Sequence, residues 1–170
     1  MRKQIYKKII IIGDSGRGKT SLARELSKKI GIQYYQTDDF FWKIKYSEAN
    51  PREESLEKIK QVFLKDEWIV EGTTLWLLEH GLEKADIIIF LRFKTLLSQW
   101  WCIIRRTIKE KRENPKELFG LMKHVTYKRY GWGYKKGKIT LRELIEPYKE
   151  KVVELKSFKE SDNFVEGFNE

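Results

Sequence analysis

The chain has 170 residues, of which 41% are hydrophobic and 35% are charged, a composition that predicts one folded domain over residues 1–170 with a solvated surface. Cys102 is the only cysteine, which excludes an internal disulfide, and no apolar run approaches the roughly 20 residues of a membrane span, so we expect a cytoplasmic protein without a membrane partner. The net charge of +10 is uneven: residues 92–156 carry 18 Lys and Arg against 7 Asp and Glu, which predicts a basic surface facing an anion.

Apolar, β-branched runs alternate with amphipathic stretches, a pattern typical of an α/β fold with a mostly parallel sheet. The first predicted strand, residues 5–12, is followed by the pattern G-x-x-x-x-G-K-[ST] at 13–20 and by a helix over 21–30. Glycines let backbone N–H groups turn toward a polyphosphate, and the helix N-terminus adds partial positive charge. Lys19 would reach the outer phosphates, and the hydroxyl of Thr20 would bind Mg²⁺. The predicted nucleotide-binding residues are Gly13, Asp14, Ser15, Gly16, Arg17, Gly18, Lys19, Thr20 and Ser21.

Acidic residues follow two further predicted strands. Asp38 and Asp39 come after the strand over residues 32–36, and Glu71 follows the strand over 68–70. Parallel strands end at the edge of the sheet that carries the phosphate loop, so Asp38 and Glu71 are candidate partners of a metal. Either of these two carboxylates fits the metal, and the other would then face the acceptor. Asp39 fits a helix N-cap or a turn equally well.

The middle of the chain continues the alternation of helices and strands. A loop is predicted over residues 47–52, helices over 53–65 and 75–84, and a buried strand over 86–91. The aromatic run Phe40-Phe41-Trp42 has two interpretations: it stacks on a base or lines an acceptor pocket, or it packs a helix onto the sheet.

Residues 94–111 form a long amphipathic helix in this prediction. Its apolar stripe is expected to be buried and consists of Leu97, Trp100, Trp101, Ile104 and Ile108. Arg106 points away from that stripe. Asn114-Pro115 ends the helix, and a basic helical segment then runs to about residue 129. A glycine-rich turn region, a helix over 141–150, a strand over 152–155 and an amphipathic segment from 158 complete the chain.

Several of these segments, in this order, resemble the nucleoside monophosphate kinase-like P-loop fold, and more narrowly the adenylate kinase-related group called DNA topology modulation proteins. The segments that carry the resemblance lie at 13–21, 37–42, 68–72, 85–91, 105–106 and 152–160. The resemblance implies a five-stranded parallel sheet with helices on both faces and a basic helical lid at approximately 105–137. It also implies ATP and Mg²⁺ as cofactors. The chain departs from the group's pattern at Glu71, at Thr73-Thr74 and at Arg92, which puts the identity of the acceptor in doubt more than nucleotide binding.

The predicted reaction moves the γ-phosphoryl group of Mg-ATP to a small acceptor, which the resemblance leads us to expect to be a nucleotide. Phosphoryl transfer requires positioning and charge neutralisation. The predicted catalytic residues are Lys19, Asp38, Arg105, Arg106 and Arg112, and the predicted metal partners are Thr20, Asp38 and Glu71. A phosphate acceptor would need a further cation, for which Arg52 and Arg92 are candidates, whereas a hydroxyl acceptor would use Asp38 as general base.

A second hypothesis is a nucleotide-regulated nucleic-acid-binding protein. Aromatic residues are interleaved with the basic ones between residues 92 and 156, a mixture suited to phosphate contacts and base stacking. A signalling GTPase is disfavoured because the chain has no Asn-Lys-x-Asp sequence.

Overall fold

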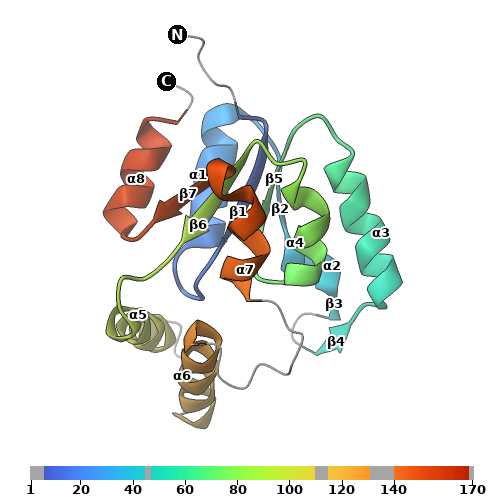
Figure 1. Cartoon of the computed structure of the whole chain (residues 1–170). Helices are drawn as coiled ribbons and strands as arrows, with labels where there is room; N and C mark the ends of the chain where they lie inside the picture. Colours follow the sequence, from blue (N-terminus) through green and yellow to red (C-terminus); the bar gives the residue numbers. More distant parts are fainter. Residues whose placement is uncertain (1–5, 45–46, 110–114, 131–139, 169–170) are drawn as a thin grey trace.

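The computed structural model describes residues 6–44, 47–109, 115–130 and 140–168 (Figure 1). Five parallel strands form the central sheet in the order β2-β5-β1-β6-β7. Their bounds are β1 Lys8–Gly13, β2 Tyr34–Gln36, β5 Trp68–Glu71, β6 Ile87–Leu91 and β7 Val152–Leu155. The predicted α/β class and the five-stranded parallel sheet are therefore confirmed.

The central strand β1 divides the core into two layers because successive side chains point to opposite faces of a sheet. Ile10 and Ile12 face one apolar cluster, and Ile9 and Ile11 face the other; all four are at most 1% exposed. A strand that is buried on both faces reads as a continuous apolar run, as it does here.

Helices cover both faces of the sheet (Figure 1). One face packs against α1 (Lys19–Ile30) and α8 (Phe158–Glu166), through Leu22, Ala23 and Leu26 of α1. The other face packs against α3 (Arg52–Phe63), α4 (Leu75–Leu82) and α7 (Leu141–Ile145). The helices on both faces of the sheet, which the resemblance implies, are therefore confirmed.

Two predicted boundaries are wrong in detail. The predicted loop at 47–52 contains β4 (Glu48–Ala49), which pairs antiparallel with β3 (Trp42–Ile44) after the short helix α2 (Thr37–Phe41). The predicted helix over 141–150 divides into α7 and a 3-10 helix, η1 (Glu146–Lys151), where Pro147 stands near the start of the second segment. Proline lacks the N–H that would continue the first helix.

The helices α5 (Leu96–Lys109) and α6 (Pro115–Tyr130) lie together beyond the end of the sheet where β1 meets its loop (Figure 1). The prediction that the stripe of α5 is buried is wrong: Leu97, Trp101 and Ile108 are 72%, 68% and 72% exposed. The buried residues of α5 are Gln99 and Ile103, on the side toward the loop. None of the described helices is long and apolar enough to cross a bilayer.

Candidate active site

The loop between β1 and α1 forms a seat at the N-terminus of α1. Gly16 and Gly18 have φ angles of 83° and 82°, in the left-handed region that glycine adopts most readily. The Nζ atom of Lys19 donates to the carbonyl oxygens of Gly13 at 3.3 Å and Asp14 at 3.1 Å. The lysine thus folds over the loop, where its ammonium would meet the outer phosphates of a bound nucleotide.

Helix α5 lies against the outside of this loop. The Nε2 atom of Gln99 donates to the carbonyl oxygen of Ser15 at 3.4 Å, and the thiol of Cys102 donates to that of Gly16 at 3.3 Å. Both bonds orient loop carbonyl groups toward α5. Since a peptide N–H points opposite to its C=O, this arrangement leaves the N–H groups of the same peptides on the side away from α5.

A cleft of about 270 Å³ opens beside the loop, and we call it the phosphate cleft. The residues of chemical interest that line it are Ser15, Gly16, Lys19, Thr20, Thr37, Asp38, Glu71 and Arg106. Four parts of the fold supply them: the loop with α1, the end of β2 with α2, the end of β5, and α5. The predicted meeting of Asp38 and Glu71 at the loop's edge of the sheet is observed.

Glu71 is the buried carboxylate of the cleft, with 4% of its surface exposed. The hydroxyl of Thr20 donates to its Oε1 atom at 2.6 Å. Burial raises the pKa of Glu71 because it disfavours the charged form; the nearby Asp38 and Asp39 add to this, while the Thr20 bond and Lys19 oppose it. A cation placed between Glu71 and Thr20 would relieve this cost.

The cleft provides ligands of the type that Mg²⁺ prefers, because Thr20 and Glu71 offer oxygen atoms next to the phosphate seat. Thr37 supports the same interpretation: it is 0% exposed and lines the cleft, and its Oγ1 atom has no hydrogen-bond partner among the described residues. The described residues contain no group of three metal-binding side chains. Magnesium commonly takes one or two protein oxygens and completes its shell with phosphate oxygens and water, so this set fits it.

The two adjacent arginines of α5 differ in position. Both side chains are exposed, but Arg106 lines the phosphate cleft and Arg105 does not. The predicted catalytic residue Arg112 lies outside the described residues. Asp38 is half-buried in the cleft, while Asp39 is exposed.

Two loop side chains, those of Arg17 and Asp14, point away from the phosphate cleft, so a phosphate bound there would meet the backbone of these two residues. The guanidinium of Arg17, 1% exposed, donates to the carbonyl oxygen of Arg92 at 3.0 Å and lies 4.4 Å from the ring centre of Phe158. The carboxylate of Asp14 accepts a bond from the backbone N–H of Phe93 at 2.9 Å. Both side chains tie the loop to neighbouring segments of the fold.

Asp14 also borders a second hollow of about 250 Å³, which we call the arginine cavity. It lies between the start of the loop, the end of β6, and helices α6 and α7. Its polar side chains are Asp14, Ser15, Arg92, Gln99, Arg129, Tyr130, Thr140 and Arg142. Ser15 lines both hollows, so the two adjoin at the loop.

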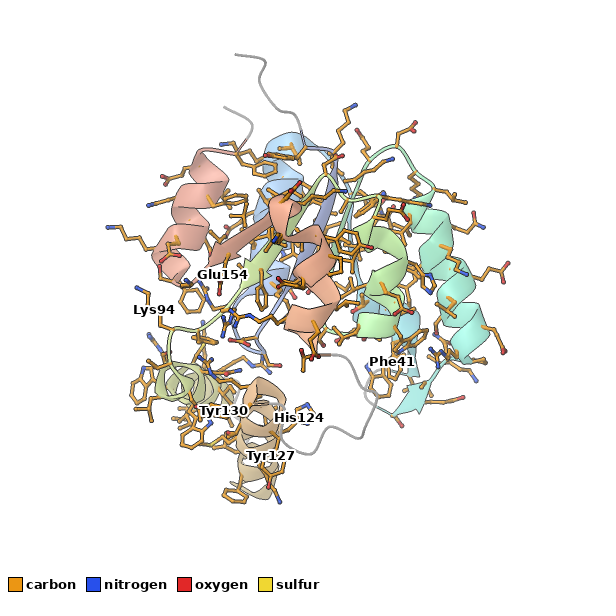
Figure 2. The ribbon with its side chains drawn as sticks, in the orientation of Figure 1. Phe41, Lys94, His124, Tyr127, Tyr130 and Glu154 are labelled. Atoms are coloured by element: carbon orange, nitrogen blue, oxygen red, sulfur yellow. The ribbon has the colours of Figure 1, made fainter. Side chains whose placement is uncertain are left out.

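The predicted aromatic run after Asp39 forms part of a cluster on the α2–β3 side of the molecule, where Figure 2 labels Phe41. The rings of Phe41 and Trp42 meet edge to face at 4.6 Å, and Phe41 lies 6.3 Å from Trp76. The guanidinium of Arg52 lies 5.0 Å from the ring centre of Trp76. Phe40 and Phe41 also pack against the core cluster, so the packing interpretation of this run is observed.

Sequence reasoning missed Thr37 and Gln99. Thr37 stands directly between the end of β2 and Asp38, so its position at a strand end was the available signal. Gln99 is a polar residue four positions before Ile103 and therefore on the same helix face. The face of α5 that carries Gln99 is less apolar than the stripe through Leu97. The hydrophobic periodicity therefore predicted the wrong face of this helix to be buried.

The raised pKa of Glu71 leads to a test in the metal-free protein. A carboxyl group whose pKa is raised by folding favours the fold below its unfolded pKa and loses that contribution as pH rises through the folded pKa. We therefore expect metal-free Glu71→Gln to melt at a higher temperature than the parent at neutral and mildly alkaline pH. The two should converge toward about pH 4, where an ordinary carboxyl becomes protonated. Melting curves against pH, with the exposed Glu57→Gln as control, measure this; a lower melting temperature for Glu71→Gln at neutral pH would contradict it.

No protein-family model matches the sequence. YqaC, an uncharacterized protein from Bacillus subtilis (strain 168), is 30% identical to this chain over 88 residues. These residues cover 50% of this chain and 48% of YqaC, so the match spans about half the length of this relative. A gluconokinase from Sinorhizobium meliloti 1021 is similar in structure, with a TM-score of 0.54 and 14% identity over 94% of this chain and 87% of its own. A shikimate kinase from Bacteroides thetaiotaomicron has a TM-score of 0.54 and 13% identity over 95% of each chain. The chain therefore shares the α/β fold of these two kinases.

Proposed function

We propose that this protein is a Mg-ATP-dependent phosphotransferase that moves the γ-phosphoryl group to a small acceptor. The observation that carries the proposal is the phosphate cleft itself. At one helix N-terminus it brings together an ammonium, a hydroxyl bonded to a buried carboxylate, a second carboxylate and a guanidinium, from Lys19, Thr20, Glu71, Asp38 and Arg106. These groups match what phosphoryl transfer requires, namely positioning and charge neutralisation.

Each group has a distinct proposed role. Lys19 and the backbone N–H groups of the loop hold the outer phosphates of the donor. Thr20 and Glu71 would hold Mg²⁺, which neutralises phosphate charge when bound. This assignment leaves Asp38, the more accessible carboxylate, to face the acceptor and to take the proton of an attacking hydroxyl.

A hydroxyl acceptor is favoured over a phosphate acceptor by the positions of two arginines. Arg92 is paired with Glu154 at 3.0 Å, and Arg52 stacks on Trp76; neither lines the phosphate cleft. The structural neighbours named gluconokinase and shikimate kinase support the same acceptor class through their names. A nucleotide acceptor, expected from the sequence resemblance, remains the alternative to test.

A panel of acceptors tests the proposal directly. ADP release from Mg-ATP would be measured with gluconate, shikimate, nucleosides and nucleoside monophosphates, each against a sample without acceptor. Stimulation by one hydroxyl compound supports the assignment of Asp38, whereas stimulation by monophosphates alone supports a nucleotide acceptor. No stimulation by any member, together with no heat from Mg-ATP in calorimetry, would overturn the proposed function.

The adjacent arginines of α5 give a matched pair of variants. We expect Arg106→Ala to lower turnover roughly 10- to 100-fold while changing ATP affinity less, because a clamp acts on charge that develops in the transition state. Arg105→Ala removes the same side chain one position away from the cleft and should keep turnover near the parent value. Steady-state kinetics and ATP titration of both variants measure this. Equal losses in the two, or weaker ATP binding with unchanged turnover in Arg106→Ala, would contradict the role of Arg106.

A nucleic-acid-binding role is the second candidate, and the exposed aromatics of α5 and α6 favour it. Trp101, Phe119 and Tyr130 are 68%, 70% and 54% exposed, and Lys123 lies 5.5 Å from the ring centre of Tyr127. Tyr127 and Tyr130 lie on α6 in Figure 2. Single-strand affinity measured against salt discriminates between the candidates: a steep fall in log K with log salt supports the binding role. No binding at about 0.1 M salt removes it.

A further inference from the structure

The arginine cavity has the features of a ligand site that the phosphate cleft does not use. Its cationic side chains come from three elements: Arg92 follows β6, Arg129 lies on α6 and Arg142 on α7. Buried apolar side chains, Phe90 at 7% and Val125 at 2% exposure, form part of the wall. A small hollow with an apolar wall and a few convergent polar groups is the usual form of a site for a small molecule.

The charges around the cavity are only partly compensated. Arg129 lies 3.5 Å from the carboxylate of Asp14 and donates to the carbonyl oxygens of Phe93 and Lys94, and Arg92 pairs with Glu154. The Arg142 side chain is exposed and makes no ion pair or hydrogen bond with the described residues. The cavity therefore keeps a net positive charge that suits an anion.

Gln99 adds an independent sign of a ligand. Its side chain is 2% exposed and lines the cavity, and its Nε2 atom is already used by the bond to Ser15. Its Oε1 atom is buried and has no hydrogen-bond partner among the described residues. A buried acceptor without a partner destabilises the fold, so a donor group supplied from outside would be favoured there.

We propose that the arginine cavity is a second binding site, for a small anion that also carries a hydroxyl or amino group. The anionic group, a carboxylate or a phosphate, meets Arg142, and the hydroxyl or amino group donates to the Oε1 atom of Gln99. The binding proposal rests on the cavity alone, whereas a role for the ligand as acceptor rests on the proposed function. Ser15 borders both hollows, which puts a ligand of the cavity next to the phosphate seat.

Four probes separate the two requirements of the site. D-glycerate and glycerol 3-phosphate each carry an anion and hydroxyls, glycerol lacks the anion, and propionate lacks the hydroxyl. We expect calorimetry on the full chain to detect the first two at millimolar concentration and to detect glycerol and propionate at least tenfold more weakly. Glycerol loses the charge-assisted bond to Arg142, and propionate loses the bond to the buried oxygen of Gln99. Similar binding of all four, or of none, would overturn the proposal. A preference between glycerate and glycerol 3-phosphate identifies which anion the site takes.

Variants tie binding to the cavity. Arg142→Met should weaken glycerate or glycerol 3-phosphate binding about tenfold or more and leave the Mg-ATP titration unchanged, because Arg142 does not line the phosphate cleft. Arg105→Met, an exposed arginine that lines neither hollow, is the control. Gln99→Leu removes the orphaned acceptor and should weaken the hydroxylated anions while leaving propionate unaffected. If Arg142→Met binds the probes as tightly as the parent, the second site is refuted, even where Mg-ATP binds normally. If the parent binds the probes but gives no heat with Mg-ATP, only the proposed function is refuted.

Discussion

The Lys19→Ala variant should lose at least ~100-fold in turnover, the loss seen when one donor to a transition-state charge is removed. Lys19 is the cation that lies directly over the loop, bonded to the carbonyl oxygens of Gly13 and Asp14. As the γ-phosphoryl group leaves, charge spreads over its oxygens, and no other lysine lines the described part of the phosphate cleft. Turnover would be measured with the acceptor that the panel identifies, at saturating Mg-ATP.

Two controls separate a catalytic loss from a general one. Lys60→Ala removes an exposed lysine of α3 and should leave turnover unchanged. The melting temperature of ligand-free Lys19→Ala should stay close to that of the parent, because water can replace the two bonds from the ammonium to the carbonyl oxygens of Gly13 and Asp14. A Lys19→Ala enzyme with turnover within threefold of the parent would disprove the catalytic assignment.

The sheet was predictable because each of its strands has a local sequence signal. The run Ile9–Ile12 reads as a strand buried on both faces, and the glycine after it marks where the strand ends. Strand order was predictable only through the family resemblance, since pairing such as that of β2 with β5 joins segments far apart in the chain. The hairpin of β3 and β4 was missed because strands of three and two residues are too short to show a period of two.

The outward face of α5 shows a limit of periodicity. An apolar stripe indicates an amphipathic helix, but which side becomes covered depends on what lies beside it. Here α5 lies beyond the end of the sheet, where the phosphate loop and α6 are its neighbours, so Gln99 and Ile103 are buried while Leu97 and Trp101 are not. No local pattern reports such a placement.

The residues that line the phosphate cleft were predictable, but the directions of the loop side chains and the contacts that hold the loop were not. Motif spacing and strand ends identified Lys19, Thr20, Asp38 and Glu71, because the chemistry of phosphate and metal restricts the residue types. The Arg17 side chain points away from the phosphate cleft, and this was not predictable, because its partner Phe158 lies 141 positions further along the chain. The same holds for the hydrogen bonds from α5 that orient the loop carbonyls.

Gly13→Ala should be the most destabilising single substitution in the loop, by about 3 kcal/mol or more, from backbone strain and overpacking together. A Cβ atom at this position would lie 2.0 Å from the carbonyl oxygen of Leu91, in the backbone of the neighbouring strand β6, and the φ angle of 141° is one that side chains rarely adopt. Gly13, the first glycine of the motif, is therefore needed for the close approach of β1 and β6 as well as for phosphate binding. For a chain of this length the expected fall in melting temperature is roughly 6–12 °C, measured without nucleotide.

Gly31→Ala is the matched control, because Gly31 also has a positive φ angle, 75°, but has open space where a Cβ atom would stand. It measures the cost of a left-handed backbone without a collision, about 1 kcal/mol. Gly13→Ala adds the collision with β6 and a φ angle that is still less favourable for a side chain. If the two variants lose the same stability, the contact between Gly13 and Leu91 contributes nothing, and the glycine is needed for the phosphates alone. If Gly13→Ala loses much more stability than Gly31→Ala in the absence of Mg-ATP, the sheet itself requires a glycine at position 13. The fold then imposes this constraint on the phosphate loop before any nucleotide binds.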